Sequence, residues 1–243
     1  VSEAISARRQ PHPARRSESH ARDDILGMLM SARDRQTGAG MTPRQIRDEI
    51  MTFLIAGHET SAAGLTWIFH LLHQHPQVTS RLQNELDSVL NGRLPTADDL
   101  PHLPYLNRVM QEAMRLYPPS WLLSRRAETD VEIGGACIPA GALVIISPYT
   151  IHRHPAFWPR PYLFDPDRFL AQLPGGHRHA YIPFGAGARL CIGDSFARTE
   201  IRLVLATILQ RYRLVQKKGY RPDPVALVTI RPREGMPMAI HPR

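Results

Sequence analysis

The longest regular pattern of hydrophobic positions begins directly after Thr42. Thr42, Pro43 and Gln45 form a helix-capping signature, with proline at the first helical position. Apolar side chains then lie around much of the helix circumference, which predicts one long, central helix over residues 43–73. Residues 57–61, Gly-His-Glu-Thr-Ser, interrupt the apolar run. Because buried polar side chains are locally unfavourable, this interruption indicates a functional site.

The remaining pattern predicts a mainly α protein with small β-sheets, an α+β fold. Further helices are expected over residues 23–33, from Pro76 to near Gly92, over 104–116, and from Gly193 through a periodic apolar run that ends at Tyr212. Short strands are expected at 131–133 and 142–146, joined by a glycine-rich turn, and at 225–230 and 236–240. Residues 150–190 have no clear period and many prolines. Such a long irregular segment is typical of functional loops.

Composition narrows the class of protein. The 243 residues are 43% hydrophobic, carry a formal charge of +8, and include only Cys137 and Cys191 as cysteines. A disulfide-rich secreted scaffold is excluded, although one bond between the two cysteines stays open. No apolar segment is long enough to span a membrane, and no secretion signal begins the chain, so we expect a cytoplasmic protein. Arginine-rich residues 1–22 predict a mobile lead-in to a domain over 23–243.

The positive charge itself does not predict nucleic-acid binding. Arginine is spread along the chain, and no ladder of aromatic and basic residues accompanies it. A basic, solvated surface is the simplest reading, followed by a surface that binds an acidic protein partner.

The strongest chemical signal is the loop from Phe184 to Gly193, Phe-Gly-Ala-Gly-Ala-Arg-Leu-Cys-Ile-Gly, which directly precedes a predicted helix. Glycines permit tight turns and the close approach of a flat partner. Backbone N–H groups and the helix N-terminus stabilise a negative sulfur at Cys191. An inert buried cysteine is the alternative for a lone cysteine, but the surrounding pattern favours a thiolate ligand.

Four motifs together resemble the cytochrome P-450 family, the haem-thiolate monooxygenases. The cysteine loop matches the family's haem-binding pattern, Phe-x-x-Gly-x-Arg-x-Cys-x-Gly, at every fixed position. Residues 56–60 resemble the motif of the family's long central helix, 112–115 its glutamate–arginine motif, and 166–169 its proline–arginine–phenylalanine motif. The last carries Asp167 where glutamate is common. The resemblance implies the C-terminal portion of the family's fold.

This resemblance implies a role for each matched residue around a haem b cofactor. Cys191 would be the axial ligand of the iron, with Phe184 beside the sulfur and Gly193 completing the loop. Arg189 would pair with a haem propionate. Arg125 would do the same, with Arg126 as the alternative residue for this contact. Gly57 would leave room for dioxygen beside the long helix. Glu59 and Thr60 would relay protons to oxygen, unless Thr60 merely bonds to the carbonyl one turn back.

Glu112, Arg115 and Arg168 are implied to be structural support for the haem site. Glu112 and Arg115 are three residues apart and therefore lie on one helix face. On spacing alone, a weak surface ion pair is expected. The resemblance implies instead that Arg168 stacks on the pair and fixes the irregular segment.

Other site readings are weaker. His58-Glu59 begins like a zinc-protease helix, but Ala62 stands where the second histidine ligand is needed. The pairs His152/His154 and His177/His179 lie in proline-rich loops, and we expect solvated histidines there. Gly185-x-Gly187 resembles the start of a dinucleotide fingerprint, but Leu190 replaces its third glycine.

The resemblance covers about the C-terminal half of the family's fold, so one wall of the substrate pocket is expected to be absent. Two functions stand. In one, the chain is a monooxygenase or its C-terminal part, which oxygenates a small apolar organic substrate with electrons from a ferredoxin, flavodoxin or reductase. In the other, it is a non-catalytic remnant or a haem-binding module without turnover.

Overall fold

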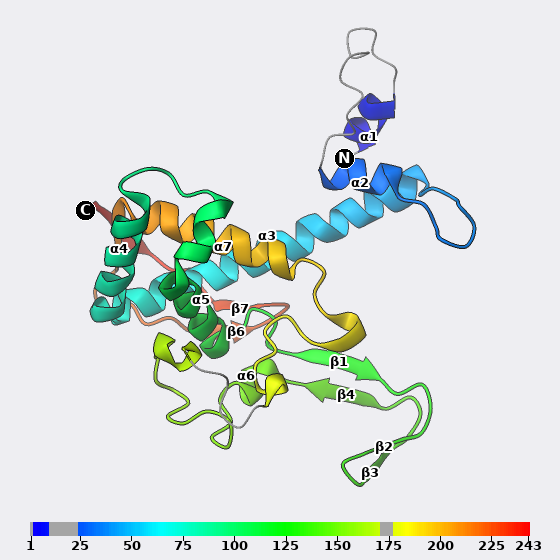
Figure 1. Cartoon of the computed structure of the whole chain (residues 1–243). Helices are drawn as coiled ribbons and strands as arrows, with labels where there is room; N and C mark the ends of the chain where they lie inside the picture. The colour runs from blue at the N-terminus through cyan, green and yellow to red at the C-terminus, as the bar shows by residue number, and fades with distance from the viewer. Residues whose placement is uncertain (1, 10–23, 171–176) are drawn as a thin grey trace. The chain divides into compact units, whose positions relative to one another are not determined.

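The computed structural model describes residues 2–9, 24–170 and 177–243. The chain divides into two compact units, Val1–His58 and Glu59–Arg243. Helix α3 (Pro43–Gln74) belongs to both, because the boundary falls within it (Figure 1). The long helix predicted over residues 43–73 is confirmed, and it ends one residue later than predicted.

The first unit consists of α1 (Ser2–Arg9), α2 (Ile25–Ser31) and the beginning of α3. The predicted cap of α3 is present: the backbone N–H of Thr42 donates to Gln45 Oε1 (2.9 Å), and that of Gln45 donates to Thr42 Oγ1 (3.3 Å). Within the expected lead-in over 1–22, residues 2–9 form a helix in which Ile5 supplies a buried apolar side chain. Residues 10–22 lie outside the described residues.

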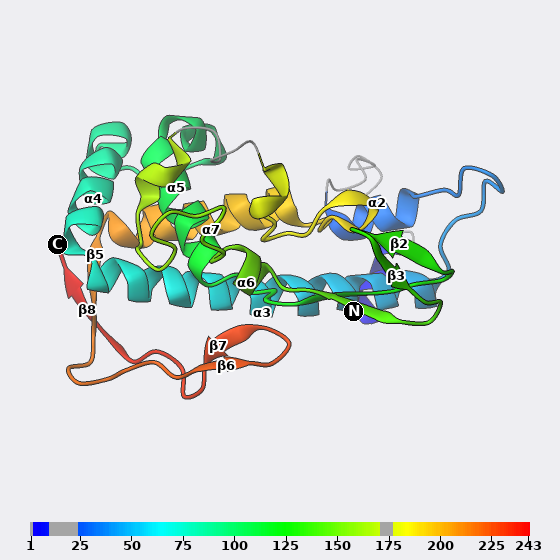
Figure 2. The same cartoon turned by 90° about the horizontal axis from the view of Figure 1, so that it is seen from below.

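The second unit is organised around helices. The remainder of α3 is followed by α4 (Pro76–Leu90), α5 (Pro104–Leu116) and α7 (Asp194–Leu209), which Figures 1 and 2 show gathered together. Apolar side chains from all four helices form one buried core that includes Ile68, Leu82, Leu86, Leu106, Met110 and Leu205. Helix α4 ends at Leu90, close to the predicted end near Gly92, and both Asn91 and Gly92 adopt a left-handed backbone there.

The strands of the described residues form two-stranded antiparallel sheets. Strand β1 (Leu123–Arg126) pairs with β4 (Leu143–Ile146), and β2 (Val131–Ile133) pairs with β3 (Ala136–Ile138). Strand β5 (Tyr212–Gln216) pairs with β8 (Met238–Pro242), and β6 (Pro224–Ala226) pairs with β7 (Ile230–Pro232). The predicted α+β fold is confirmed.

Strand pairing differs from the prediction. We predicted that 131–133 and 142–146 are neighbours, whereas the chain turns at Gly134 and Gly135 and pairs β2 with β3. The predicted strand 225–230 is a hairpin, and Tyr212 begins β5 rather than ending the last helix. A short apolar run does not by itself determine where a strand begins or ends, or which other strand it pairs with.

The irregular segment before the cysteine loop contains α6 (Pro148–Ile151) and 3₁₀ turns at Pro166–Phe169 and Arg178–Ala180, and the loop itself contains a third such turn at Gly187–Arg189. One expectation here is wrong: His152 is fully buried rather than solvated. Its Nε2 accepts the backbone N–H of Ile182 (2.8 Å), and burial lowers its pKa to about 3. The histidine fastens the end of α6 to the chain that leads into the cysteine loop.

None of the described helices combines the length and the apolar character that a membrane span requires.

Candidate functional site

The loop before α7 holds Cys191 at the surface as a free cysteine. The backbone N–H of Cys191 donates to the carbonyl of Phe184 (2.9 Å), and that of Leu190 donates to Gly187 (3.0 Å). Gly185 and Gly187 have φ angles of +77° and +71°, which side chains rarely tolerate. The loop therefore needs both glycines to bring Cys191 back to Phe184.

The residues that flank Cys191 connect it to the core. Gly193 caps α7, and a Cβ placed on it would lie 3.8 Å from Cys191 Sγ. Phe184 is half-buried against the hydrophobic core, and the guanidinium of Arg198 lies over its ring, 4.6 Å from the centroid. The ion pair between Arg198 and Asp194 belongs to the first turn and a half of α7. The thiol is thus presented by a rigid loop at a helix N-terminus.

Strand β1 passes close to the same loop. Leu123 Cδ1 lies 3.7 Å from the position of a Cβ on Gly185. Alternate residues of a strand share a face, so Arg125 lies on the face of Leu123 and Arg126 on the opposite one. Arg125 and Arg189 are both exposed, and neither forms an ion pair within the parts of the chain that the structure describes. This placement favours Arg125 over Arg126 as the second predicted cation.

Glu112, Arg115 and Arg168 come together in a buried cluster. Arg115 forms two hydrogen bonds with Glu112 (2.7 and 2.9 Å), and both side chains are fully buried. The weak surface pair expected from spacing alone is therefore excluded. Arg168 joins through a hydrogen bond from Nε to Glu112 Oε1 (3.2 Å), where stacking was expected.

This cluster fixes the irregular segment by its backbone. Arg115 Nη1 donates to the carbonyls of His152 and Pro161 (2.7 Å each), and Arg168 Nη2 donates to that of Arg160 (2.7 Å). Glu112 Oε1 also accepts the backbone N–H of Asp165 (2.9 Å). The buried cluster thus holds the backbone at several points between His152 and Asp165.

The predicted oxygen-side residues lie along α3. Gly57 is half-buried, and a Cβ on it would meet nothing within 4 Å. Thr60 is half-buried, and Glu59 Oε1 accepts a hydrogen bond from Thr229 Oγ1 (2.8 Å). Gly57 falls in the first unit, whereas Glu59 and Thr60 fall in the second.

Sequence reasoning missed the residues that connect α3 to the rest of the second unit. Ser61 Oγ donates to Glu200 Oε2 on α7 (2.7 Å), and Gly64 lets Ile201 of α7 approach the α3 backbone. Thr229, which holds Glu59, was likewise missed. Ser61 lies in the polar interruption at residues 57–61, but its partner Glu200 is 139 residues away, and Thr229 is 170 residues away from Glu59. No local pattern marks partners at such distances.

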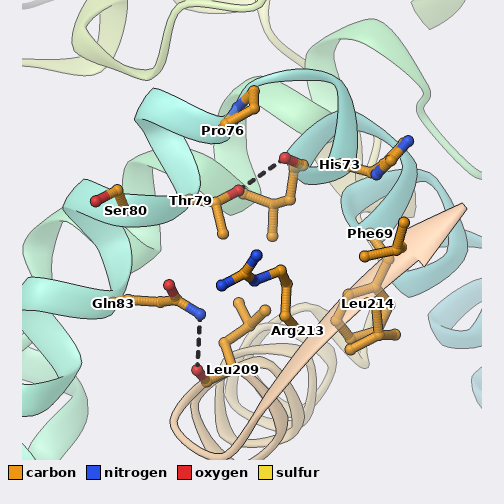
Figure 3. Close-up of a pocket in the computed structure, with 11 residues that line it drawn as sticks. Phe69, His73, Pro76, Thr79, Ser80, Gln83, Leu209, Arg213 and Leu214 are labelled. Carbon is orange, nitrogen blue, oxygen red and sulfur yellow. Dashed lines mark hydrogen bonds between the residues drawn. The ribbon is translucent and has the colours of Figure 1, made fainter. Parts of the chain in front are cut away.

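A separate pocket lies at the far end of α3. Its volume is about 340 Å³, and Figure 3 shows Arg213 among side chains from α3, α4, α7 and β5. Thr79 Oγ1 donates to the carbonyl of Leu72 (2.7 Å), and Gln83 Nε2 donates to that of Leu209 (3.3 Å). None of the predicted site residues lines this pocket.

The donor set around Cys191 fits a haem. A thiolate is a known axial ligand of haem iron. Leu190, Ile192 and Phe196 expose large apolar side chains beside it (51%, 86% and 65% exposed), as a flat apolar macrocycle requires. Arg125 and Arg189 form no ion pair with the described residues, so both cations are available for the carboxylates of a haem. No cluster of three or more histidine, cysteine or acidic side chains in the described residues offers a competing metal site.

Comparison with known proteins identifies the family. The model of the family described as "Cytochrome P450" matches residues 2–236. Cyclooctatin synthase of Streptomyces melanosporofaciens is 43% identical over 227 residues, which are 93% of this chain and 48% of that protein. Pentalenene oxygenase of Streptomyces avermitilis is 42% identical over 216 residues, 88% of this chain and 48% of that protein.

Solved structures agree. The cytochrome P450DA heme domain superposes with a TM-score of 0.87 at 35% identity, over 100% of this chain and 52% of that one. Retinoic acid bound cyanobacterial CYP120A1 gives 0.90 at 31% identity, over 100% of this chain and 54% of that one. This chain belongs to the cytochrome P450 family. It spans about half the length of the relatives it matches.

Proposed function

We propose that this chain carries the haem-thiolate centre of a monooxygenase. The reaction inserts one atom of dioxygen into a small apolar organic substrate and reduces the other to water with two electrons from a redox partner. The observation that carries this proposal is the cysteine loop: an exposed, free Cys191 is fixed by a backbone hydrogen bond to Phe184 and by two positive-φ glycines at the start of α7.

The cofactor we propose is iron protoporphyrin IX, haem b. Neither cysteine lies in a Cys-x-x-Cys-His sequence, so a covalently attached haem of that type is not expected. When bound, the haem supplies dioxygen activation, which a thiolate ligand promotes by donating electron density. Cys191 Sγ would hold the iron, Phe184 would shield the sulfur from water, and Arg125 and Arg189 would bind the propionates.

We assign the handling of protons to side chains of α3. Gly57 would keep its part of the helix surface free of side-chain atoms, and Glu59 and Thr60 would hold and transfer protons. Such a relay requires side chains within hydrogen-bond reach of each other or of an ordered water. Both residues are half-buried, so each keeps part of its surface accessible to solvent, from which the protons come.

An apolar substrate fits both the surface of this chain and the names of its relatives. The tip of the β6–β7 hairpin exposes Leu227 and Val228 (55% and 85% exposed), immediately before the threonine that contacts Glu59. Two relatives, a pentalenene oxygenase and a cyclooctat-9-en-7-ol 5-monooxygenase, act by their names on an alkene and an alkenol. We therefore propose a largely hydrocarbon substrate.

The electron donor we propose is an acidic protein of the ferredoxin or flavodoxin class, or a reductase. The chain carries a net charge of +8, and Arg198 and Arg202 of α7 add cations to the helix that begins at the cysteine loop. An acidic partner surface would complement these cations, and complementary charge speeds the encounter of redox partners.

The reduced carbon monoxide spectrum tests the proposal. We expect the haem-reconstituted protein to show the red-shifted Soret band that characterises thiolate-bound haem. Cys191→Ser should lose this band, whereas Cys137→Ser, which alters the other exposed free cysteine, should retain it.

Two results would contradict the proposal. A preparation that stays colourless after haem addition would favour a non-catalytic remnant. An unchanged spectrum in Cys191→Ser would remove this residue as the iron ligand.

A further inference from the structure

The carboxylate of Glu59 is held by a residue that lies 170 positions away in the chain. Thr229 Oγ1 donates to Glu59 Oε1 at 2.8 Å. Thr229 is only 1% exposed, whereas Glu59 is half-buried. A hydroxyl has a single proton to donate, so Thr229 commits its donor to this carboxylate.

Thr229 is itself fixed by its backbone surroundings. The indole N–H of Trp67 donates to the carbonyl of the next residue, Ile230 (2.9 Å), and the N–H of Ile230 donates to Pro119 (3.1 Å). Trp67 is fully buried and stacks on Tyr117 with ring centroids 4.0 Å apart. Glu59 takes no part in these contacts, so the threonine is held independently of its hydrogen bond to the carboxylate.

Glutamate is the mobile partner in this pair. Its longer side chain has more rotatable bonds than threonine, whose branched Cβ restricts χ1. A proton-transfer group works only when it stays within hydrogen-bond reach of its partner. A fixed hydroxyl on one carboxylate oxygen therefore reduces the conformations that Glu59 can adopt.

We propose that Thr229 is a positioning residue for proton transfer by Glu59. It anchors Oε1 and leaves Oε2 as the oxygen that exchanges protons. This inference rests on the proposed function, because it assigns a purpose to the hydrogen bond only if Glu59 carries protons. It also gives the β6–β7 hairpin a role beyond substrate contact, since the loop that bears Leu227 and Val228 orients the acid on α3.

A peroxide-driven assay tests the proposal without an identified substrate or electron donor. The haem-loaded protein oxidises guaiacol with hydrogen peroxide; two guaiacol molecules each lose one electron and one proton, and the peroxide becomes two water molecules. We expect Glu59→Gln to lower kcat by tenfold or more, since acid–base catalysis contributes on that scale or above. Thr229→Val should lower kcat several-fold with an unchanged KM for guaiacol.

Two further variants separate positioning from a structural effect. Thr229→Ser keeps the hydroxyl and should restore most of the activity. Thr207→Val removes a hydroxyl that bonds only within α7, to Leu203 (2.7 Å), and should leave kcat unchanged. Wild-type kcat in Thr229→Val, or no rescue by Thr229→Ser, would overturn the inference.

A double-mutant cycle on the haem-free protein tests the contact itself. Thr229→Val and Glu59→Ala should each lower the urea midpoint of unfolding. In the double variant, the decrease in the midpoint should be smaller than the sum of the two single decreases. Additive effects would overturn the inference.

The outcomes also separate this inference from the proposed function. If Glu59→Gln leaves kcat unchanged, the proton relay fails and the inference with it. If Glu59→Gln lowers kcat and Thr229→Val does not, only the inference fails.

Discussion

At the scale of single residues, Glu112 is the buried carboxylate on which the side chains of Arg115 and Arg168 converge. Its Oε1 accepts hydrogen bonds from Arg115, Arg168 and the backbone of Asp165, and its Oε2 accepts a further bond from Arg115. In a fully buried setting, removal of one charge leaves its partners unpaired, which costs far more than an exposed pair contributes.

We therefore expect Glu112→Gln to lower the free energy of unfolding by about 3–5 kcal/mol, because the guanidinium of Arg115 would be left without an anion. Chemical denaturation measures the change. Asp223→Asn is the matched control: it breaks the Asp223–Arg233 pair, which is mostly exposed, and should cost at most about 1 kcal/mol. Equal losses in the two variants would show that the buried cluster is no more than a surface ion pair.

At the scale of elements, the contact between α3 and α7 depends on Gly64. A Cβ on this buried glycine would lie 3.6 Å from both Ile201 and Pro119, which is ordinary van der Waals contact. Glycine is also the poorer helix former. The site therefore has room for one methyl group and for nothing larger.

We expect Gly64→Ala to raise the free energy of unfolding by about 0.5–1 kcal/mol, because alanine favours the helix and its methyl group fits. Gly64→Leu should lower it, since the added atoms would collide with Ile201 and Pro119. Urea denaturation of the two variants measures both effects. A destabilised alanine variant would mean that the two helices pack more closely than the structure indicates.

The same scale shows what sequence could and could not predict. The cap of α3, the Glu112–Arg115 pair and the cysteine loop are local patterns, and each was predictable from residues within ten positions. The pairing of strands was not predictable in this way. Strands β1 and β4 lie on either side of the β2–β3 hairpin in the sequence, and a short apolar strand does not specify its partner. The hydrogen bonds that Thr229 and Glu200 make to α3 could not be predicted either, because their partners are 170 and 139 residues away in the sequence.

At the scale of the whole molecule, buried His152 links stability to pH. Burial is the main cause of its lowered pKa, to about 3 from 6.5, and the nearby charges of Arg115 and Arg153 add to it. Between these values the unfolded chain binds a proton that the folded protein does not. Stability therefore decreases as pH falls from 6.5 towards 3, and it is unaffected by this group above 6.5.

We expect the free energy of unfolding to decrease by up to about 1.4 kcal/mol per pH unit from this residue alone. His152→Gln keeps an acceptor for the N–H of Ile182 and should show a correspondingly shallower pH dependence. His154→Gln, at an exposed position, is the control. Identical slopes in the wild type and His152→Gln would mean that His152 is protonated in the folded protein. Burial also lowers the pKa of His70, but this residue contributes equally to the pH dependence of the wild type and of both variants.

The account as a whole depends on the bond between Cys191 and iron. X-ray absorption at the iron edge of the haem-loaded protein tests that bond directly. We predict one sulfur atom in the first coordination shell of the wild-type protein and its loss in Cys191→Ser. A wild-type shell of nitrogen and oxygen atoms alone would contradict the account.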